Sequence, residues 1–390
     1  MLSCQKQLFS LPDNVHYLNC AYMSPLLRRV EQAGIEGLRR KRLPAGIAPE
    51  DFFRESDHAR ALFGRLVNAE PARIAIIPAA SYGLATAARN TPLSRGRSIV
   101  LAHDQYPSNV YIWQRLAREA GAEVRTVIPP DAPGRGAAWN ARLLDAIDAR
   151  TAVVALGNVH WADGTRFDLE RIGAHAREVG AALVVDGTQS VGALPFDVAR
   201  VQPDALVCAA YKWLLGPYSI GLAYFGPRYD AGIPLEETWL ARVHSEDFRR
   251  LVEYEDEYRA GAVRYDVGER SNFIVLPMLI AALEQVLEWA PARIQEYCRA
   301  LSAELLEEAR ALGYRVEEEA WRGAHLFGVR TPPGLDLERL QRLLAEQNVI
   351  ASLRGSALRV SPHVYNDRQD IEALLDVLRG ALETGRRPGA

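Results

Sequence analysis

The chain has 390 residues, with 46 Lys plus Arg against 49 Asp plus Glu and a formal net charge of −3. This balance gives no general attraction to nucleic acid or to an anionic membrane surface, so we expect neither as a partner. With 48% hydrophobic and 24% charged residues, the composition is that of a globular protein. The length favours about two domains.

The four cysteines, Cys4, Cys20, Cys208 and Cys298, are scattered without a paired spacing. Such usage is typical of a reducing compartment, so we expect a cytoplasmic protein. The eight histidines form no HxH or HxxxH pair, and no metal site is predicted. We also expect neither a secretion signal nor a membrane span, because no charged-then-apolar leader and no apolar run of about 18 residues is present.

The first half of the chain predicts an extended arm at 17–22, helices at 25–42 and 49–67, and then alternating strands and helices. We expect strands at 74–77, 98–101, 124–127, 152–156, 182–185, 205–208 and 221–225, and helices at 82–89, 108–120, 138–149 and 169–179. Apolar strands separated by helices indicate a mostly parallel seven-stranded sheet covered on both faces. The connection at 214–220 is too short for a crossover helix, which predicts an antiparallel final strand.

The second half predicts a smaller α+β domain. A long helical region at 277–312, broken near Ala290 and Pro291, precedes a mixture of short elements. We expect strands at 314–317, 326–330, 349–353 and 357–361, and helices at 337–347 and 370–382. We place the large domain at 20–268 and form the small domain from 1–19 with 269–385. The tail at 385–390 is expected to be disordered.

Lysine usage singles out one position. The chain has only three lysines, Lys6, Lys41 and Lys212, and only Lys212 lies among apolar and aromatic residues, beside Tyr211 and Trp213. Unlike a guanidinium, a desolvated amine can lose its proton and attack a carbonyl carbon. The alternative is a surface lysine whose aliphatic stem packs beside aromatic rings.

Polar and aromatic side chains follow several predicted strands, at the edge of a parallel sheet where ligands bind. These residues are Ser81, Tyr82, Tyr106, Asn158, His160, Asp186 and Gln189. Ser81 and Tyr82 open a helix whose free amides suit a phosphate, although Ser81 taken alone is more simply a helix cap. Tyr106 is placed either to stack on a ring or to pack in the core. An Asp that ends an apolar strand, as Asp186 does, needs a partner such as a protonated ring nitrogen.

An anion cradle, a stacking aromatic, a carboxylate and a reactive amine together suit pyridoxal phosphate. They suit a nicotinamide dinucleotide less well, because that ligand is typically bound by a GxGxxG turn after the first strand. The chain has no such turn there.

Two segments, VVDGTQS at 184–190 and YKWLLGP at 211–217, resemble the class V aminotransferase family of fold-type I pyridoxal-phosphate enzymes. Their spacing and the intervening Asp197 and Asp204 also fit. That family includes cysteine desulfurases, kynureninases and isopenicillin N epimerase-like proteins, and the resemblance covers nearly the whole chain. It implies a large α/β domain that binds pyridoxal 5′-phosphate, a small α+β domain, and a homodimer whose active sites are shared between subunits.

The resemblance also implies roles for cofactor-binding residues. Lys212 would form the internal aldimine and then move protons, and Asp186 would pair with the pyridine nitrogen. Gln189 would hydrogen-bond the ring oxygen, and Tyr106 would stack on the ring. The phosphate would be held by Ser81, by Tyr82 with the adjoining amides, and by Tyr211, which resembles a kynureninase tyrosine.

For the substrate, the segment LRVSP at 358–362 is similar to the family segment whose arginine binds an α-carboxylate, which implies that role for Arg359; a surface arginine at a strand edge is the alternative. Asn158 and His160 are candidate substrate contacts. Ser271 and Asn272 lie where relatives reach into the site of the partner subunit, and are candidate phosphate or substrate contacts.

The resemblance implies an enzyme that acts on an amino acid through the Lys212 aldimine, with transamination as the first candidate. A lyase of desulfurase or kynureninase type, or an epimerase, would begin in the same way. The segment 354–357 holds no cysteine, which disfavours a persulfide-forming desulfurase. Two alternatives from other classes are a non-catalytic binding protein on the same fold and a nucleotide-binding α/β protein, although the latter lacks a Walker-type segment.

Overall fold

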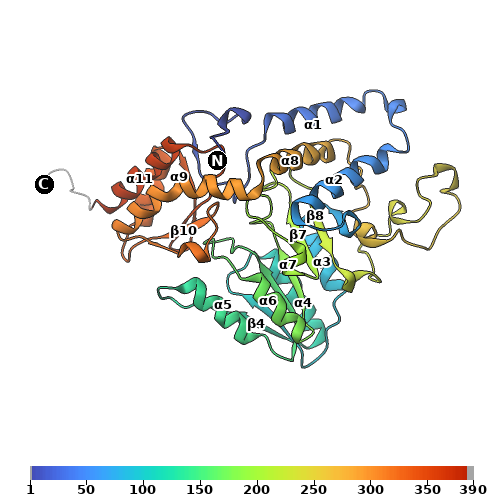
Figure 1. The fold of residues 1–390 in the computed structure, drawn as a ribbon, viewed down its shortest axis with the longest axis horizontal. Coiled ribbons are helices and arrows are strands. Elements are labelled where there is room, and N and C mark those ends of the chain that lie inside the picture. Colours follow the sequence, from blue (N-terminus) through green and yellow to red (C-terminus); the bar gives the residue numbers. More distant parts are fainter. Residues whose placement is uncertain (1, 384–390) are drawn as a thin grey trace.

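The computed structural model describes residues 2–383, so the tail for which disorder was predicted lies outside the described residues. Figure 1 shows a large sheet with its helices in the lower part of the view and a smaller sheet with the C-terminal helices at the left. Helix α9 (Pro291–Ala311) runs toward the smaller sheet, and α8 (Val275–Trp289) lies over the larger one. The chain therefore folds around two sheets, as predicted.

The large sheet has seven strands in the order β2-β8-β7-β6-β5-β3-β4. Their bounds are Ile74–Ile77 (β2), Ser98–Ala102 (β3), Glu123–Val127 (β4), Thr151–Gly157 (β5), Ala182–Asp186 (β6), Ala205–Ala209 (β7) and Gly221–Phe225 (β8). Strand β8 is antiparallel to both of its neighbours, whereas the remaining neighbouring pairs are parallel. The predicted mostly parallel α/β sheet, with an antiparallel strand as the last of its strands along the chain, is thus confirmed.

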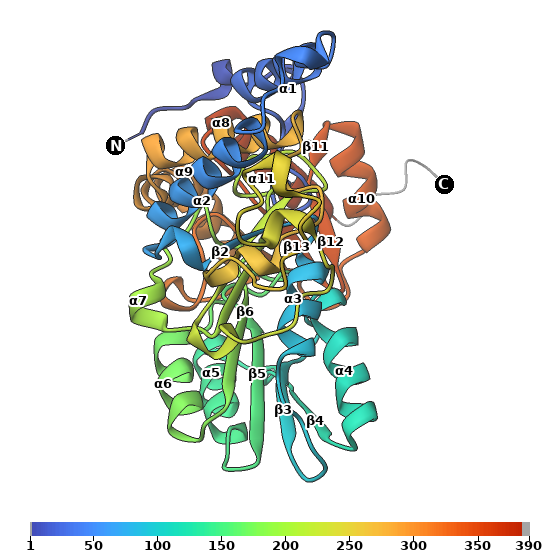
Figure 2. The ribbon, with the colours of Figure 1, turned by 90° about the vertical axis from the view of Figure 1, so that its right-hand side faces the viewer.

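Helices cover both faces of this sheet because alternate residues of each apolar strand point to opposite sides. In β6, Leu183 and Val185 belong to the core on one face, and Val184 belongs to the core on the other. Figure 2 shows α5 and α6 on one side of the strands and α3 and α4 on the other. The bounds of these helices are Ala80–Arg89 (α3), Ser108–Ala120 (α4), Arg135–Ala146 (α5), Leu169–Glu178 (α6) and Val198–Val201 (α7).

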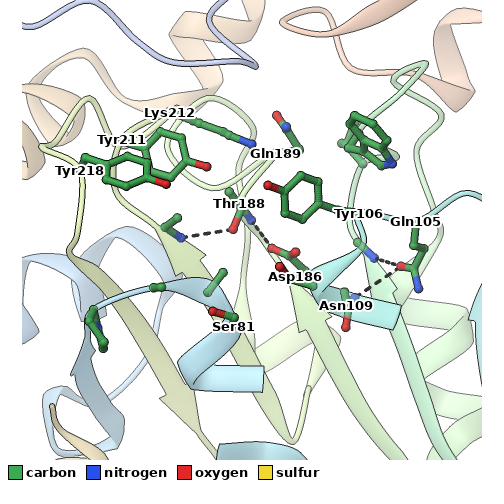
Figure 3. A pocket seen from close by; sticks show the side chains of 18 of the residues that line it. Ser81, Gln105, Tyr106, Asn109, Asp186, Thr188, Gln189, Tyr211, Lys212 and Tyr218 are labelled. Atoms are coloured by element: carbon green, nitrogen blue, oxygen red, sulfur yellow. Dashed lines mark hydrogen bonds between the residues drawn. The ribbon is translucent and has the colours of Figure 1, made fainter. Parts of the chain in front are cut away.

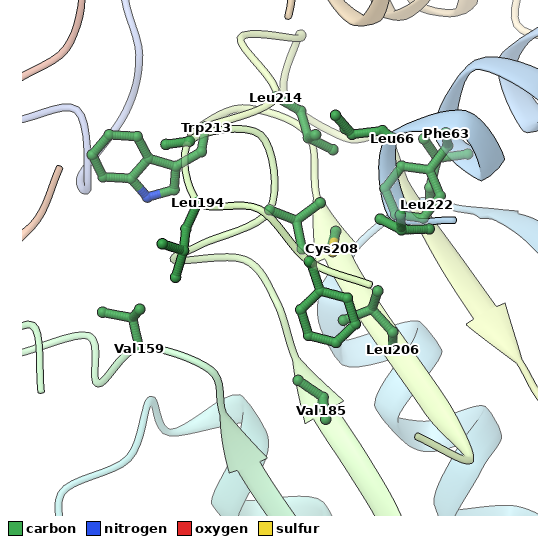
Figure 4. Close-up of a cluster of buried hydrophobic side chains, with 14 of the residues drawn as sticks. Phe63, Leu66, Val159, Val185, Leu194, Leu206, Cys208, Trp213, Leu214 and Leu222 are labelled. Carbon is green, nitrogen blue, oxygen red and sulfur yellow. The ribbon is translucent and has the colours of Figure 1, made fainter. Parts of the chain in front are cut away.

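The segment that carries Lys212 is anchored in the larger of these cores. Leu206 and Cys208 of β7 pack in one buried cluster with Phe63, from α2 (Asp51–Val67), and with Trp213 and Leu214 (Figure 4). Trp213 and Leu214 are at most 1% exposed. Since burying such side chains stabilises a fold by about 1.5–3 kcal/mol each, the residues that flank Lys212 fix the position of its backbone.

The small sheet has the order β12-β13-β10-β9. Its strands are Arg315–Val316 (β9), Phe327–Arg330 (β10), Ser352–Arg354 (β12) and Ala357–Val360 (β13), and α9, α10 (Leu337–Glu346) and α11 (Arg368–Leu382) share its core. The strand predicted at 349–353 is divided in two. Its first part, β11 (Val349–Ile350), pairs in parallel with β1 (His16–Tyr17), and only its second part joins the small sheet. The backbone of β11 hydrogen-bonds to the N-terminal arm instead of to the small sheet. The local sequence pattern around β11 does not reveal this distant partner.

The N-terminal arm joins the two sheets. Leu18 exchanges backbone hydrogen bonds with Ile350 and Ser361 of the small domain, and Ser24 donates its amide to the Tyr211 carbonyl of the large one. Beyond it, α1 (Arg28–Arg40) packs on α8. The predicted break near Ala290 is confirmed, since this residue has a φ of 62° between α8 and α9.

Helix α8, assigned by sequence to the small domain, contacts α1 and α2, and its buried residues join the core of the large sheet. The domain boundary at 268 stays a prediction. Within residues 2–383 no single helix is long and apolar enough to cross a membrane; α8 and α9 meet that criterion only when counted together, and they are bent by 68°.

Candidate active site

A cavity of about 220 Å³ lies at the carboxyl ends of β2, β3, β5, β6 and β7. The side chains that point into it come from loops far apart in the sequence (Figure 3). The labelled lining residues are Ser81, Gln105, Tyr106, Asn109, Asp186, Thr188, Gln189, Tyr211, Lys212 and Tyr218. Parallel strands end at one edge of the sheet, which is why residues predicted separately meet here.

Lys212 is 5% exposed, and its amine faces this cavity. Its Nζ lies 5.3 Å from the ring centre of Tyr106 and 5.4 Å from that of Tyr211. In the described part of the chain, no carboxylate lies within ion-pair distance of this nitrogen. Burial lowers the pKa of Lys212 to about 8, against the opposing attraction of the Asp186 charge. A substantial fraction of the amine is therefore neutral, and nucleophilic, near neutral pH.

Asp186 ends β6 on the floor of the cavity. One carboxylate oxygen accepts the Thr188 amide at 3.0 Å, and the Thr188 hydroxyl in turn accepts the Ala209 amide at 3.2 Å. The other carboxylate oxygen of Asp186 accepts no hydrogen bond from the residues described. Burial raises the pKa of Asp186, with the Thr188 hydrogen bonds and Lys212 opposing. An oxygen left unpaired in such a place fits the protonated ring nitrogen of the predicted cofactor.

The amino end of α3 forms one wall, where Ala79, Ala80 and Ser81 line the cavity. The first turn of a helix leaves its amides without intrahelical partners, which suits an anion. A Cβ on Gly83 would come within 2.9 Å of Val207, so this glycine allows α3 to pack closely on β7. The Tyr82 side chain does not line the cavity; its ring packs against the core beneath α3.

Aromatic rings enclose the upper part of the cavity. Tyr106 is 40% exposed and meets Trp161 edge-on, with ring centres 5.6 Å apart. Tyr211 contacts Tyr218 at 4.6 Å between ring centres. These rings offer aromatic faces beside the Lys212 amine, on which a planar heterocycle can stack.

The side-chain amide of Gln189 is fixed from two directions. Its Nε2 donates to the Ala21 carbonyl at 3.1 Å, and its Oε1 accepts from the indole of Trp213 at 3.0 Å.

The backbone of Gln189 is held by His325, which is fully buried. Nδ1 of His325 accepts a hydrogen bond from Gln295, so its Nε2 donates to the Gln189 carbonyl, at 2.9 Å. Burial lowers the pKa of His325 to about 4, which keeps it neutral in this network.

The structure separates the two candidate substrate contacts that follow β5. His160 lines the cavity, but its Nδ1 lies 3.2 Å from Asp163 and its Nε2 lies 3.1 Å from the carbonyls of His103 and Asp104. Both ring nitrogens are therefore engaged within the protein. Asn158 lies on the other side of the strand end and lines a different cavity, of about 940 Å³.

Arg359 is 1% exposed and comes from β13 of the small domain. Its guanidinium donates to the Trp161 carbonyl at 2.9 Å and to Asn19 at 3.4 Å. Burial lowers the pKa of Arg359 to about 10, and the charge of Arg354 adds to that effect. The small domain thus brings a buried positive charge against Trp161, one wall of the lysine cavity, although Arg359 itself does not line that cavity.

Ser271 and Asn272 do not line the cavity within a single chain. Ser271 donates its hydroxyl to the Phe52 carbonyl, and Asn272 accepts the amides of Ile274 and Val275, both at 3.0 Å. Asn272 therefore caps the start of α8. Their predicted contribution to a partner subunit stays a prediction.

Sequence reasoning did not identify several lining residues. Gln105 donates to the Ala155 carbonyl at 2.9 Å and accepts the Gly157 amide at 3.1 Å, which ties the Tyr106 loop to β5. Thr188 and Tyr218 also line the cavity. Their positions in the sequence could have identified two of these residues as site residues. Gln105 directly precedes Tyr106, and Thr188 lies between Asp186 and Gln189.

The family model for class V aminotransferases matches residues 48–374. Among curated proteins, the chain is 25% identical over 378 residues to the uncharacterized aminotransferase YcbU of Bacillus subtilis, covering 95% of each chain. It is 30% identical to a probable cysteine desulfurase of Pyrococcus abyssi, covering 85% of this chain and 84% of that one. It is also 26% identical to the isopenicillin N epimerase of Streptomyces clavuligerus, covering 82% and 83%.

Solved structures show the same fold. A variant of C-DES with glycine covalently linked to its PLP cofactor superposes with a TM-score of 0.83 at 19% identity, covering 98% of this chain and 100% of that one. The cysteine desulfurase CsdA of Escherichia coli gives 0.79 at 20% identity, covering 97% of each. The fold-type I architecture is confirmed, and the family's dependence on pyridoxal phosphate agrees with the cofactor predicted from the sequence. The chain belongs to the class V aminotransferase family.

Proposed function

We propose that this protein transforms an amino acid with pyridoxal phosphate held by Lys212. The observation that carries the proposal is a buried amine, with a pKa lowered to about 8, that shares one cavity with Asp186, of which one carboxylate oxygen is unpaired. When bound, the cofactor would supply an aldehyde for the substrate's amine and a ring that accepts electrons.

The chain's own residues supply binding and proton transfer. Asp186 would keep the ring nitrogen protonated, and the amides beside Ser81 would hold the phosphate. Tyr106 would cover one face of the ring. Lys212, freed when the substrate's amine takes its place, would remove and return the proton at the substrate's Cα. Arg359 would hold the α-carboxylate, because its planar guanidinium suits two parallel hydrogen bonds.

Transamination is the reaction that we place first, supported by the family and by the full-length relative named as an aminotransferase. A lyase or an epimerase remains an alternative, since relatives carry both names. A persulfide-forming desulfurase has little support: Cys20, Cys208 and Cys298 are buried, and none of the chain's four cysteines lines the cavity. We also propose a homodimer, to which Ser271 and Asn272 would contribute.

The proposal is tested by loading the purified protein with pyridoxal phosphate and screening the amino acids one at a time. A transaminase converts the cofactor to its amine form and releases a 2-oxo acid. A lyase releases a fragment of the side chain, and an epimerase only inverts Cα. Lys212→Ala should abolish every response, whereas Lys41→Ala, the matched change at an exposed lysine, should abolish none. A protein that binds no cofactor, or responds to no amino acid, would contradict the proposal.

A further inference from the structure

A second cavity, of about 530 Å³, lies against the wall of the lysine cavity. The two share Gln105, His160 and Trp161 as lining residues. The second cavity is closed on its far side by the turn between β12 and β13, at residues 354–357. The two cavities therefore meet at these three residues, and the second cavity extends from them toward this turn.

Most charged groups that line the second cavity are paired with each other. Arg135 and Arg330 both meet Asp163, at 2.8 Å and 2.5 Å. His103 lies 3.2 Å from Asp104, and His160 also faces Asp163. These contacts account for both carboxylates that line the cavity.

Arg354 is the exception. In the described part of the chain, no carboxylate lies within ion-pair distance of its guanidinium, and its buried Nε has no hydrogen-bond partner. The one side-chain hydrogen bond that it makes is to the neighbouring Leu353 carbonyl. Its guanidinium carbon lies 5.4 Å from the ring centre of Trp161, and that of Arg359 lies 6.0 Å from the same centre.

Two positive groups therefore lie beside one indole without an acidic partner within residues 2–383. Arg359 is buried and Arg354 is half-buried, and charges in such places are costly unless a ligand compensates them. They also repel each other, since the charge of Arg354 lowers the pKa of both Arg359 and Lys212, and an anionic ligand would relieve this repulsion. A substrate with a single carboxylate would compensate only one of the two.

We propose that Arg354 binds a second carboxylate of the substrate, so that the enzyme acts on an amino acid with an acidic side chain. This inference rests on the proposed function, because Arg359 must take the α-carboxylate of a substrate bound at Lys212. Both guanidinium groups lie beside the Trp161 ring, at 5.4 Å and 6.0 Å from its centre, and their separation sets the span between the carboxylates. Arg354 is thus the specificity-determining residue on the side-chain end of the site.

The test uses the cofactor-loaded enzyme and ligands that cannot react, because they lack an amine. Succinate, glutarate and adipate are titrated calorimetrically, each against the monocarboxylate with the same number of carbons. The wild type should bind the best diacid roughly ten- to a hundred-fold tighter than its monoacid, as expected for a charge-assisted contact. Arg354→Gln should bring this ratio close to one, and Arg354→Lys should restore part of it.

Arg342→Gln is the matched control, because this exposed arginine of α10 lies in the same domain and loses the same charge. It should leave the ratio unchanged. Equal affinities for diacids and monoacids in the wild type, or a diacid preference that survives in Arg354→Gln, would overturn the inference. The absorbance of the bound cofactor separates the two failures. A normal band with no diacid preference rejects only this inference, whereas a missing band rejects the proposed function and the inference with it.

Discussion

The indole of Trp213 donates a hydrogen bond to Oε1 of Gln189 at 3.0 Å, linking the residue after Lys212 to the loop after Asp186. Both side chains are buried, with exposures of 0% and 5%. This contact therefore joins the buried segment that carries the reactive amine to the β6 loop. It also orients the amide that is proposed to meet the cofactor ring.

Trp213→Phe should loosen this arrangement. The substitution keeps an aromatic ring but leaves the Gln189 oxygen without its donor, which costs about 1–3 kcal/mol. We expect weaker binding of pyridoxal phosphate and a shifted cofactor absorbance, measured by titration. Trp139→Phe is the control, because that indole also donates a buried hydrogen bond, at 2.8 Å, but to the carbonyl of Val127, which does not line the lysine cavity as Gln189 does. Equal effects of both variants on cofactor binding would contradict the assigned role.

The amine of Lys212 should titrate well below an ordinary lysine in the cofactor-free protein. Only the neutral amine attacks an aldehyde, and burial lowers its pKa to about 8. The rate at which added pyridoxal phosphate reacts, followed by stopped-flow absorbance, should therefore rise with pH around a midpoint near 8. A midpoint close to the ordinary value of 10.5 would mean that the amine is solvated.

Asp186→Asn should separate cofactor binding from catalysis. The amide is similar in size, so Lys212 should still bind the cofactor, but the ring nitrogen would lose its anionic partner. We expect the exchange of the substrate's Cα proton with deuterated water to slow at least about a hundred-fold, as measured by NMR. Near wild-type exchange would remove Asp186 from the proposed mechanism.

Sequence patterns predicted the features that depend on residues close together in the chain. Runs of four or five residues identified the seven strands of the large sheet, strand ends identified Asp186, Gln189 and Tyr106, and lysine usage identified Lys212. The short connection after Lys212 correctly predicted that β8 is antiparallel. It is short because a tight turn replaces a helix, with Leu215 at a φ of 56°.

Features that depend on distant partners were not predictable in the same way. Gln189 is held by Ala21 and Trp213, which lie 168 and 24 residues away in the chain. The pairing of β11 with β1 joins segments more than 300 residues apart, and so divides a run that looks like one strand. Asn158 and His160 are separated by only one residue, yet line different cavities, because the chain turns sharply after β5.

A buried ion network beneath the site was also missed by sequence reasoning. Asp266 is fully buried and pairs with Arg60 at 2.6 Å and with Arg270 at 2.7 Å, while accepting the Ile76 amide of β2 at 2.8 Å. Asp266→Asn would leave the buried Arg270 without a counter-ion, and Arg60 with only Asp57, at 3.5 Å. We expect the free energy of unfolding in urea to fall by about 3–5 kcal/mol.

The exposed Asp256→Asn is the control for this variant, and should change stability by no more than about 0.5 kcal/mol. If Asp266→Asn unfolded at the same urea concentration as this control, the network would contribute nothing measurable to the fold.

The most direct test of the central claim is to reduce the cofactor-loaded protein with borohydride and locate the modified lysine by peptide mass spectrometry. The chain offers only Lys6, Lys41 and Lys212 as side-chain amines. We predict a stoichiometric phosphopyridoxyl group on Lys212 alone, absent from Lys212→Ala. Modification of Lys6 or Lys41 instead, or of no lysine at all, would contradict the account.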